Sequence, residues 1–88
     1  MLTSPAEASD EVAAARVRFA GDTLIVVLDD GRELSLPLGG ISWLRWLLEA
    51  TSAQRANWTL EPRGFAIYWS DLDDGIEVRH LLTPGRLA

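Results

Sequence analysis

Residues 16–37 combine a strict two-residue alternation with a β-branched run, and two turn sequences separate these segments. Gly21-Asp22 has the composition of a two-residue hairpin turn, and the Asp-Asp-Gly sequence at 29–31 supplies a second turn. A period of two is typical of strands that bury one of their faces. The stretch therefore predicts an antiparallel meander of three strands.

The length of the second turn decides which residues share a face. A two-residue loop would put the leucines of the third strand on the face that carries two arginines, and would divide the core. A three-residue loop, with Gly31 in the left-handed region, pairs Val26 with Leu34 and Leu24 with Leu36. We predict the three-residue loop. The apolar face then consists of Val17, Phe19, Leu24, Val26, Leu28, Leu34 and Leu36.

The segment 41–50 predicts one helix on the apolar face of the meander, because four apolar residues recur at helical spacing. These are Ile41, Leu44, Leu47 and Leu48. Thr51 has the position of an N-cap, with Gln54 at the third helical position. This capping box predicts a second short helix over 52–57.

The remaining apolar residues predict a second hairpin and a short closing segment. Trp58 and Leu60 alternate before a Pro-Arg-Gly turn at 62–64. A second alternating set follows the turn: Phe65, Ile67 and Trp69. The acidic stretch at 71–75 ends this hairpin. The last buried segment turns helical before Pro84, and its apolar residues are Ile76, Val78, Leu81 and Leu82.

These elements predict a single α+β domain over residues 16–83. It contains an antiparallel three-stranded meander and a second hairpin, packed against two short helices, with a short C-terminal helical turn. A chain of 88 residues has room for one small core of this kind. We expect residues 1–15 to form a flexible N-terminal tail and residues 84–88 a C-terminal tail.

Several motifs together resemble the DUF2442 family of small bacterial proteins. They are Asp30-Gly31-Arg32 with Leu34-x-Leu36-Pro37-Leu38, then Ala50-Thr51-x-x-Gln54-Arg55, then Trp58, then Gly64-x-x-Ile67-x-Trp69-x-x-Leu72-Asp73-x-x-Ile76-x-Val78-x-x-Leu81-Leu82. The resemblance implies an α+β domain with antiparallel sheet and short helices. It also implies that no activity is established, and that such a protein is often encoded beside another small protein, in a pairing suggestive of toxin and antitoxin.

Composition excludes several classes of function. The chain has 13 acidic and 8 basic residues, a formal net charge of −5, which disfavours binding to nucleic acid, including through Arg16 and Arg18. It has no cysteine, which excludes disulfides and cysteine-ligated zinc. No apolar stretch approaches a membrane span and no signal peptide is visible, so we expect a cytoplasmic protein without a membrane segment.

Tryptophan is the residue type that points to a binding role, since four of the 88 residues are tryptophan and this residue is enriched in interface hot spots. Trp58 and Trp69 are in phase with apolar neighbours and are expected in the core. Trp43 and Trp46 lie beside the apolar stripe of their helix, with Arg45 between them. They form either an interaction surface or filling for a small core. We predict a non-enzymatic protein–protein interaction module, one half of a two-protein pair or a homodimer, without a cofactor.

The alternative is a ligand-binding protein or enzyme that uses Trp69, Asp71, Asp73 and His80. His80 is the only histidine, and a catalytic base needs a nucleophile and an orienting partner close by. The acidic stretch resembles the start of a calcium loop, but Leu82 stands where the loop needs its last glutamate. We therefore expect no metal site, and read the stretch as a turn whose aspartates bind backbone N–H groups.

Overall fold

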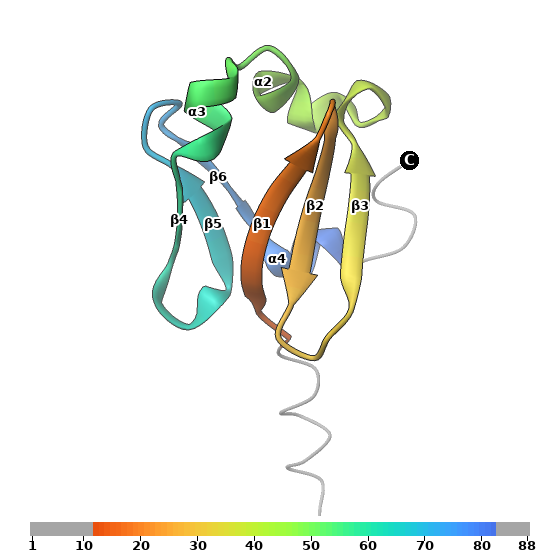
Figure 1. The fold of residues 1–88 in the computed structure, drawn as a ribbon. Coiled ribbons are helices and arrows are strands. Elements are labelled where there is room, and N and C mark those ends of the chain that lie inside the picture. Colours follow the sequence, from red (N-terminus) through yellow and green to blue (C-terminus); the bar gives the residue numbers. More distant parts are fainter. Residues whose placement is uncertain (1–11, 83–88) are drawn as a thin grey trace, which may run out of the picture.

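The computed structural model describes residues 12–82, which form two three-stranded antiparallel sheets facing one core, with the helical turns of residues 38–56 at one end (Figure 1). The first sheet has the order β1-β2-β3, with β1 at Ala14–Ala20, β2 at Thr23–Leu28 and β3 at Glu33–Pro37. The second has the order β4-β5-β6, with β4 at Trp58–Leu60, β5 at Ala66–Trp69 and β6 at Asp74–Glu77. The α+β class is confirmed. Of the tails expected at 1–15 and 84–88, residues 1–11 and 84–88 lie outside the described residues, whereas Ala14 and Ala15 belong to β1.

The predicted register of the meander is confirmed. Val26 pairs with Leu34 and Leu24 with Leu36, and Gly31 has a φ of 96°, so the second loop has three residues. Asp30 closes this loop, because its carboxylate accepts hydrogen bonds from the backbone N–H of Arg32 at 3.1 Å and from the Arg32 Nε at 2.8 Å. The first strand of the meander starts earlier than predicted. β1 begins at Ala14, not at Arg16, with an irregularity in pairing between these two residues.

The prediction of one helix over 41–50 is wrong. The chain forms two 3₁₀ turns, η1 (Leu38–Gly40) and η2 (Ser42–Leu44), followed by one α-helical turn, α2 (Arg45–Leu48). The buried residues of this stretch are Leu38, Ile41, Leu44 and Leu47. They recur every three residues, which is the period of a 3₁₀ helix and not of an α-helix. Ile41 is extended (φ −124°, ψ 103°) and separates the two 3₁₀ turns.

The second short helix is confirmed as α3 (Ser52–Ala56), and its capping box is complete. The Thr51 hydroxyl accepts the Gln54 N–H at 3.1 Å, and the Gln54 side chain accepts the Thr51 N–H at 2.9 Å. The second hairpin is also present, with η3 (Pro62–Gly64) as its turn. The sequence missed the third strand of this sheet, β6, because Asp74 and Gly75 are poor strand formers. Val78–Leu81 then forms the C-terminal helical turn, α4.

One arginine on α3 connects the elements that surround the core. The side chain of Arg55 is 12% exposed, and its guanidinium donates to the carbonyls of Leu47 (3.0 Å) and Leu48 (3.1 Å) at the end of α2. It also donates to the Gly21 carbonyl at 3.1 Å and to the Asp22 carboxylate at 3.0 Å, in the turn between β1 and β2. Arg55 therefore ties the helical end to the first sheet.

The same residue also contacts two aromatic side chains of the core. Its guanidinium carbon lies 5.3 Å from the centre of the Phe19 ring. Its carbonyl accepts the indole N–H of Trp69 at 3.0 Å, and Trp69 is fully buried on β5. Phe19 and Trp69 meet edge to face, with ring centres 6.4 Å apart. Arg55 thus joins both sheets as well as the helices.

We expect Arg55→Lys to lower the free energy of unfolding by about 2–3 kcal/mol, because a lysine ammonium cannot reach the four acceptors that the planar guanidinium bridges. Urea unfolding followed by tryptophan fluorescence measures the change. Arg45→Lys is the matched control, since Arg45 is 71% exposed and pairs only with Glu49 at 3.6 Å. The control should change stability by less than about 0.5 kcal/mol. Equal losses in the two variants would contradict this role of Arg55.

A glycine at the end of η3 brings the second sheet against the first. Gly64 has a φ of 72°, and a Cβ atom on it would overlap the carbonyl oxygen of Ala14 in β1. We expect Gly64→Ala to destabilise the fold by about 3 kcal/mol or more, from the combined backbone strain and overlap. Gly21→Ala meets no neighbouring atom, although Gly21 also has a positive φ, of 58°. It should cost only about 1 kcal/mol in thermal unfolding, the strain alone.

Candidate functional site

The predicted interaction surface, Trp43, Arg45 and Trp46, is only partly exposed. Trp43 lies on η2 and is 39% exposed, whereas Trp46 on α2 is half-buried. The Trp46 ring meets the buried Trp69 edge to face, with centres 5.7 Å apart, and its indole N–H donates to the Trp43 carbonyl at 3.1 Å. Trp46 therefore anchors the backbone of Trp43 to the core. The exposed part of the surface consists of Trp43 and Arg45.

The local sequence explains why Trp43 is presented to solvent. Ile41 and Leu44 are buried and lie three residues apart, one period of a 3₁₀ helix, so the turn directs the two side chains between them, Ser42 and Trp43, outward. Gly39 and Gly40 precede it and are exposed, with no other atom near the positions where their side chains would be. Arg45 follows it and pairs with Glu49 at 3.6 Å on the surface. Trp43 is thus a large apolar side chain in open, uncrowded surroundings.

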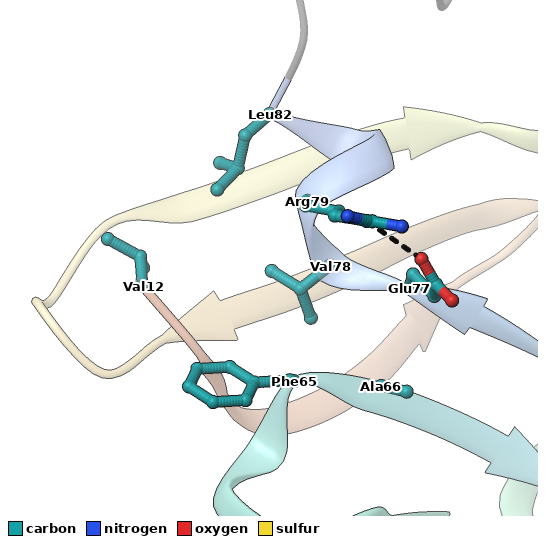
Figure 2. A pocket seen from close by; sticks show the side chains of 7 residues that line it. All are labelled: Val12, Phe65, Ala66, Glu77, Val78, Arg79 and Leu82. Atoms are coloured by element: carbon teal, nitrogen blue, oxygen red, sulfur yellow. Dashed lines mark hydrogen bonds and ion pairs between the residues drawn. The ribbon is translucent and has the colours of Figure 1, made fainter. Parts of the chain in front are cut away.

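Phe65 is the other large apolar side chain that the described residues expose, at 37%. The sequence placed it in the core, in phase with Ile67 and Trp69, and this is wrong. Its backbone is helical (φ −81°, ψ −11°), so the alternation of β5 begins only at Ala66. Phe65 instead borders an open groove of about 440 Å³ (Figure 2). The groove is lined by Val12, Phe65, Ala66, Glu77, Val78, Arg79 and Leu82.

A second groove, of about 470 Å³, lies between β1 and the α3–β4 segment. Phe19 and Trp58 contribute its aromatic surface, and Arg55 closes its end. Trp58 was expected in the core with Trp69, with which it pairs across β4 and β5, but it is only half-buried. The Arg55 guanidinium is already engaged by backbone carbonyls and Asp22. The groove's other arginine, Arg18, pairs with Glu33 at 3.4 Å, so both charged groups that line this groove already have partners.

The residues of the alternative site are not brought together. Trp69 is buried in the core. Asp71 accepts from the Asn57 side chain at 3.1 Å, and Asp73 accepts from the Tyr68 hydroxyl at 2.7 Å, both near the turn before β6. His80 is on α4, beyond the other end of β6, where its Nε2 lies 3.6 Å from Glu77. The length of β6 separates the histidine from the two aspartates.

The aspartates of the acidic turn, residues 71–75, accept more hydrogen bonds from side chains than from backbone N–H groups. Only Asp74 among its aspartates accepts a backbone N–H, from Gly75 at 2.8 Å. Asp73 has a φ of 51°, in the left-handed region. Within residues 12–82, no three histidine, aspartate or glutamate side chains are grouped as a metal ion requires.

Tyr68 was not among the residues that the sequence analysis singled out. It lies on β5 between the buried Ile67 and Trp69, so its side chain points to the opposite face of the sheet. The hydrogen bond to Asp73 raises the pKa of its hydroxyl above the ordinary value of 10.0, and desolvation and the negative charges of Asp73, Glu61 and Asp74 act in the same direction. The alternation of β5 was the available signal.

Tyr68 is the only tyrosine, so its ionisation can be followed directly by ultraviolet absorbance. Because its pKa in the fold is raised, its hydroxyl stabilises the fold below pH 10.0 and loses this contribution as the pH rises through the folded pKa. We expect the titration midpoint of the native protein to lie above that of the urea-unfolded chain. Asp73→Asn should lower the native midpoint, and Asp29→Asn, at a distant turn, should leave it in place. Coinciding native and unfolded midpoints would contradict the assignment.

The family model described as "Protein of unknown function (DUF2442)" matches residues 14–86. The chain belongs to the DUF2442 family. The resemblance found in the sequence is thereby confirmed, and it covers every strand and helix described above. Membership in DUF2442 identifies the domain without assigning it an activity.

A solved structure supports the DUF2442 fold independently of the family model. The crystal structure of a protein of unknown function from Rhodospirillum rubrum is similar, with a TM-score of 0.67 and 22% sequence identity. The similarity covers 89% of this chain and 99% of that one. At this identity it shows the fold alone. None of the curated proteins compared with this chain matches it.

The helices of the described part, residues 12–82, are all short. None of them is long and apolar enough to pass through a bilayer.

Proposed function

We propose that this DUF2442 protein is a non-enzymatic, cytoplasmic protein-binding module that contacts its partner through Trp43 and Arg45. The observation that carries the proposal is the 39% exposure of Trp43 on a backbone that Trp46 fixes to the core. A rigid, exposed tryptophan beside an arginine is the combination of residue types most enriched in interface hot spots. The partner is the second protein of a toxin–antitoxin-like pair, or a second copy of this chain.

The geometry around Trp43 suits binding better than catalysis. Its backbone is already held by the indole of Trp46, so little conformational entropy is lost when a partner covers the ring. The exposed glycines before it leave room for a partner to approach the ring closely. Arg45 is bound only by a surface ion pair, which a carboxylate of the partner can replace at small cost.

Co-purification of the tagged full chain from its native organism tests this proposal. We expect Trp43→Ala to weaken capture of the partner by about thirtyfold or more, the loss typical of a hot-spot residue. Phe65→Ala is the matched control, because it removes the other exposed aromatic ring and should leave capture unchanged. Thermal unfolding verifies that both variants fold. A Trp43→Ala variant that folds and captures the partner at wild-type level would refute the proposal, as would capture lost only with Phe65→Ala.

A further inference from the structure

The outer face of the second sheet is a flat surface centred on Tyr68. The register places Thr59 on one side of Tyr68 and Gly75 on the other, and the next row along the strands contains Ala66 between Glu61 and Glu77. Thr59 and Gly75 are exposed, and Tyr68 and Ala66 are half-buried. The described elements therefore leave this sheet face open to a partner.

The ring of Tyr68 is held in a fixed position on this face. At one end, its hydroxyl donates to Asp73 at 2.7 Å. At its side, the ring carbon Cδ1 would lie 3.4 Å from a Cβ atom on Gly75, so the ring lies against the glycine and occupies the space that a side chain there would fill. Because Tyr68 is only half-buried, a preorganised aromatic surface remains accessible above the sheet.

The charges around the ring are negative. The carboxylates of Glu61, Asp73 and Asp74 all act electrostatically on the Tyr68 hydroxyl. Glu77 is in the neighbouring row and pairs with Arg79 at 2.9 Å. Arg79, like Arg63 in the turn at η3, belongs to the end of the sheet away from Asp73. The surface near Tyr68 thus combines an aromatic ring with the carboxylate of Asp73 at its hydroxyl end and that of Glu61 in the neighbouring row.

An organic cation fits this surface better than a metal ion. The carboxylates are spread around a ring, and no metal-binding group of three occurs within the described residues. A guanidinium is planar, stacks on aromatic rings and donates to carboxylates in its own plane, whereas an ammonium is a compact point charge. The surface is therefore complementary in shape and in charge to arginine.

We propose that the outer face of the β4-β5-β6 sheet docks a basic segment of a partner protein, with an arginine guanidinium stacked on Tyr68 between the carboxylates of Glu61 and Asp73. This proposal rests on the proposed function in one respect, because it takes the occupant of the surface to be a protein. It assigns that partner a basic, arginine-containing contact segment and adds a second contact surface to that of Trp43. The net charge of −5 favours the approach of such a segment from solution.

The probe for this surface is a short fluorescent peptide of alternating arginine and serine, titrated with the full chain at low salt and followed by anisotropy. We expect Tyr68→Leu to weaken peptide binding about fivefold and Tyr68→Phe to retain it within about twofold, because an aromatic ring remains in the second variant. We expect Glu61→Gln to weaken binding about threefold. The matched control is Glu49→Gln, which removes the same charge from a different surface and should have no effect.

Two further comparisons exclude binding by net charge alone. A lysine–serine peptide of equal length should bind more weakly than the arginine peptide, since lysine cannot stack as a plane. In amide NMR spectra of the wild-type chain, the arginine peptide should shift Thr59, Tyr68 and Gly75, and not Trp43. The proposal is overturned by equal losses in Glu49→Gln and Glu61→Gln, by undiminished binding in folded Tyr68→Leu, by equal binding of the lysine peptide, or by shifts centred elsewhere.

Trp43→Ala separates this inference from the proposed function. It should bind the arginine peptide as the wild type does, even where partner capture is lost. Loss of peptide binding in folded Trp43→Ala would place the basic contact at the Trp43 surface and overturn the assignment to the sheet. Wild-type capture by Trp43→Ala, together with weak peptide binding by Tyr68→Leu, would refute the proposed function and leave the sheet surface supported.

Discussion

The remaining structure depends on the hydrogen bonds that the guanidinium of Arg55 donates. It donates to the carbonyls of Leu47 and Leu48 at the end of α2, of which Leu47 also accepts the Ala50 N–H at 3.2 Å, and it binds Asp22 and the Gly21 carbonyl in the first sheet. A small domain cannot bury enough apolar surface to tolerate several unpaired polar groups at its edge. The planar guanidinium of Arg55 has five N–H donors, and it pairs polar groups at the point where the helices and the first sheet meet.

The core beneath Arg55 determines what the surface can present. Trp69 fills the space between the sheets, and Phe19 and Trp46 meet its edges. Because Trp46 is used in this way, the binding surface that the sequence assigned to two tryptophans is reduced to Trp43. The same packing fixes the Trp43 backbone. The structural role of Trp46 and the binding role proposed for Trp43 therefore belong to two residues that are three positions apart in the chain.

The two proposed contact surfaces arise from two different residue periods, that of a 3₁₀ turn and that of a strand. Trp43 is exposed because the 3₁₀ period of its segment buries Ile41 and Leu44 and turns the residues between them outward. Tyr68 is exposed because the two-residue period of β5 turns it away from Ile67 and Trp69. The first surface is apolar and local. The second is acidic and assembled from three strands, so it exists only when the sheet is formed.

The sequence by itself determined the meander, its register, the capping box at Thr51 and the family, because burial pattern and turn chemistry act over a few neighbouring residues. It also predicted most of the core, including Trp69. Tertiary structure decided the rest. Leu38 had to be buried along with Ile41 and Leu44, which broke the expected helix into 3₁₀ turns, and pairing with β5 made a strand of Asp74–Glu77 despite its poor propensity. The positions of Arg55 and Phe65 followed from contacts between distant segments, which no local pattern encodes, whereas the alternation of β5 already turns Tyr68 to the outer face.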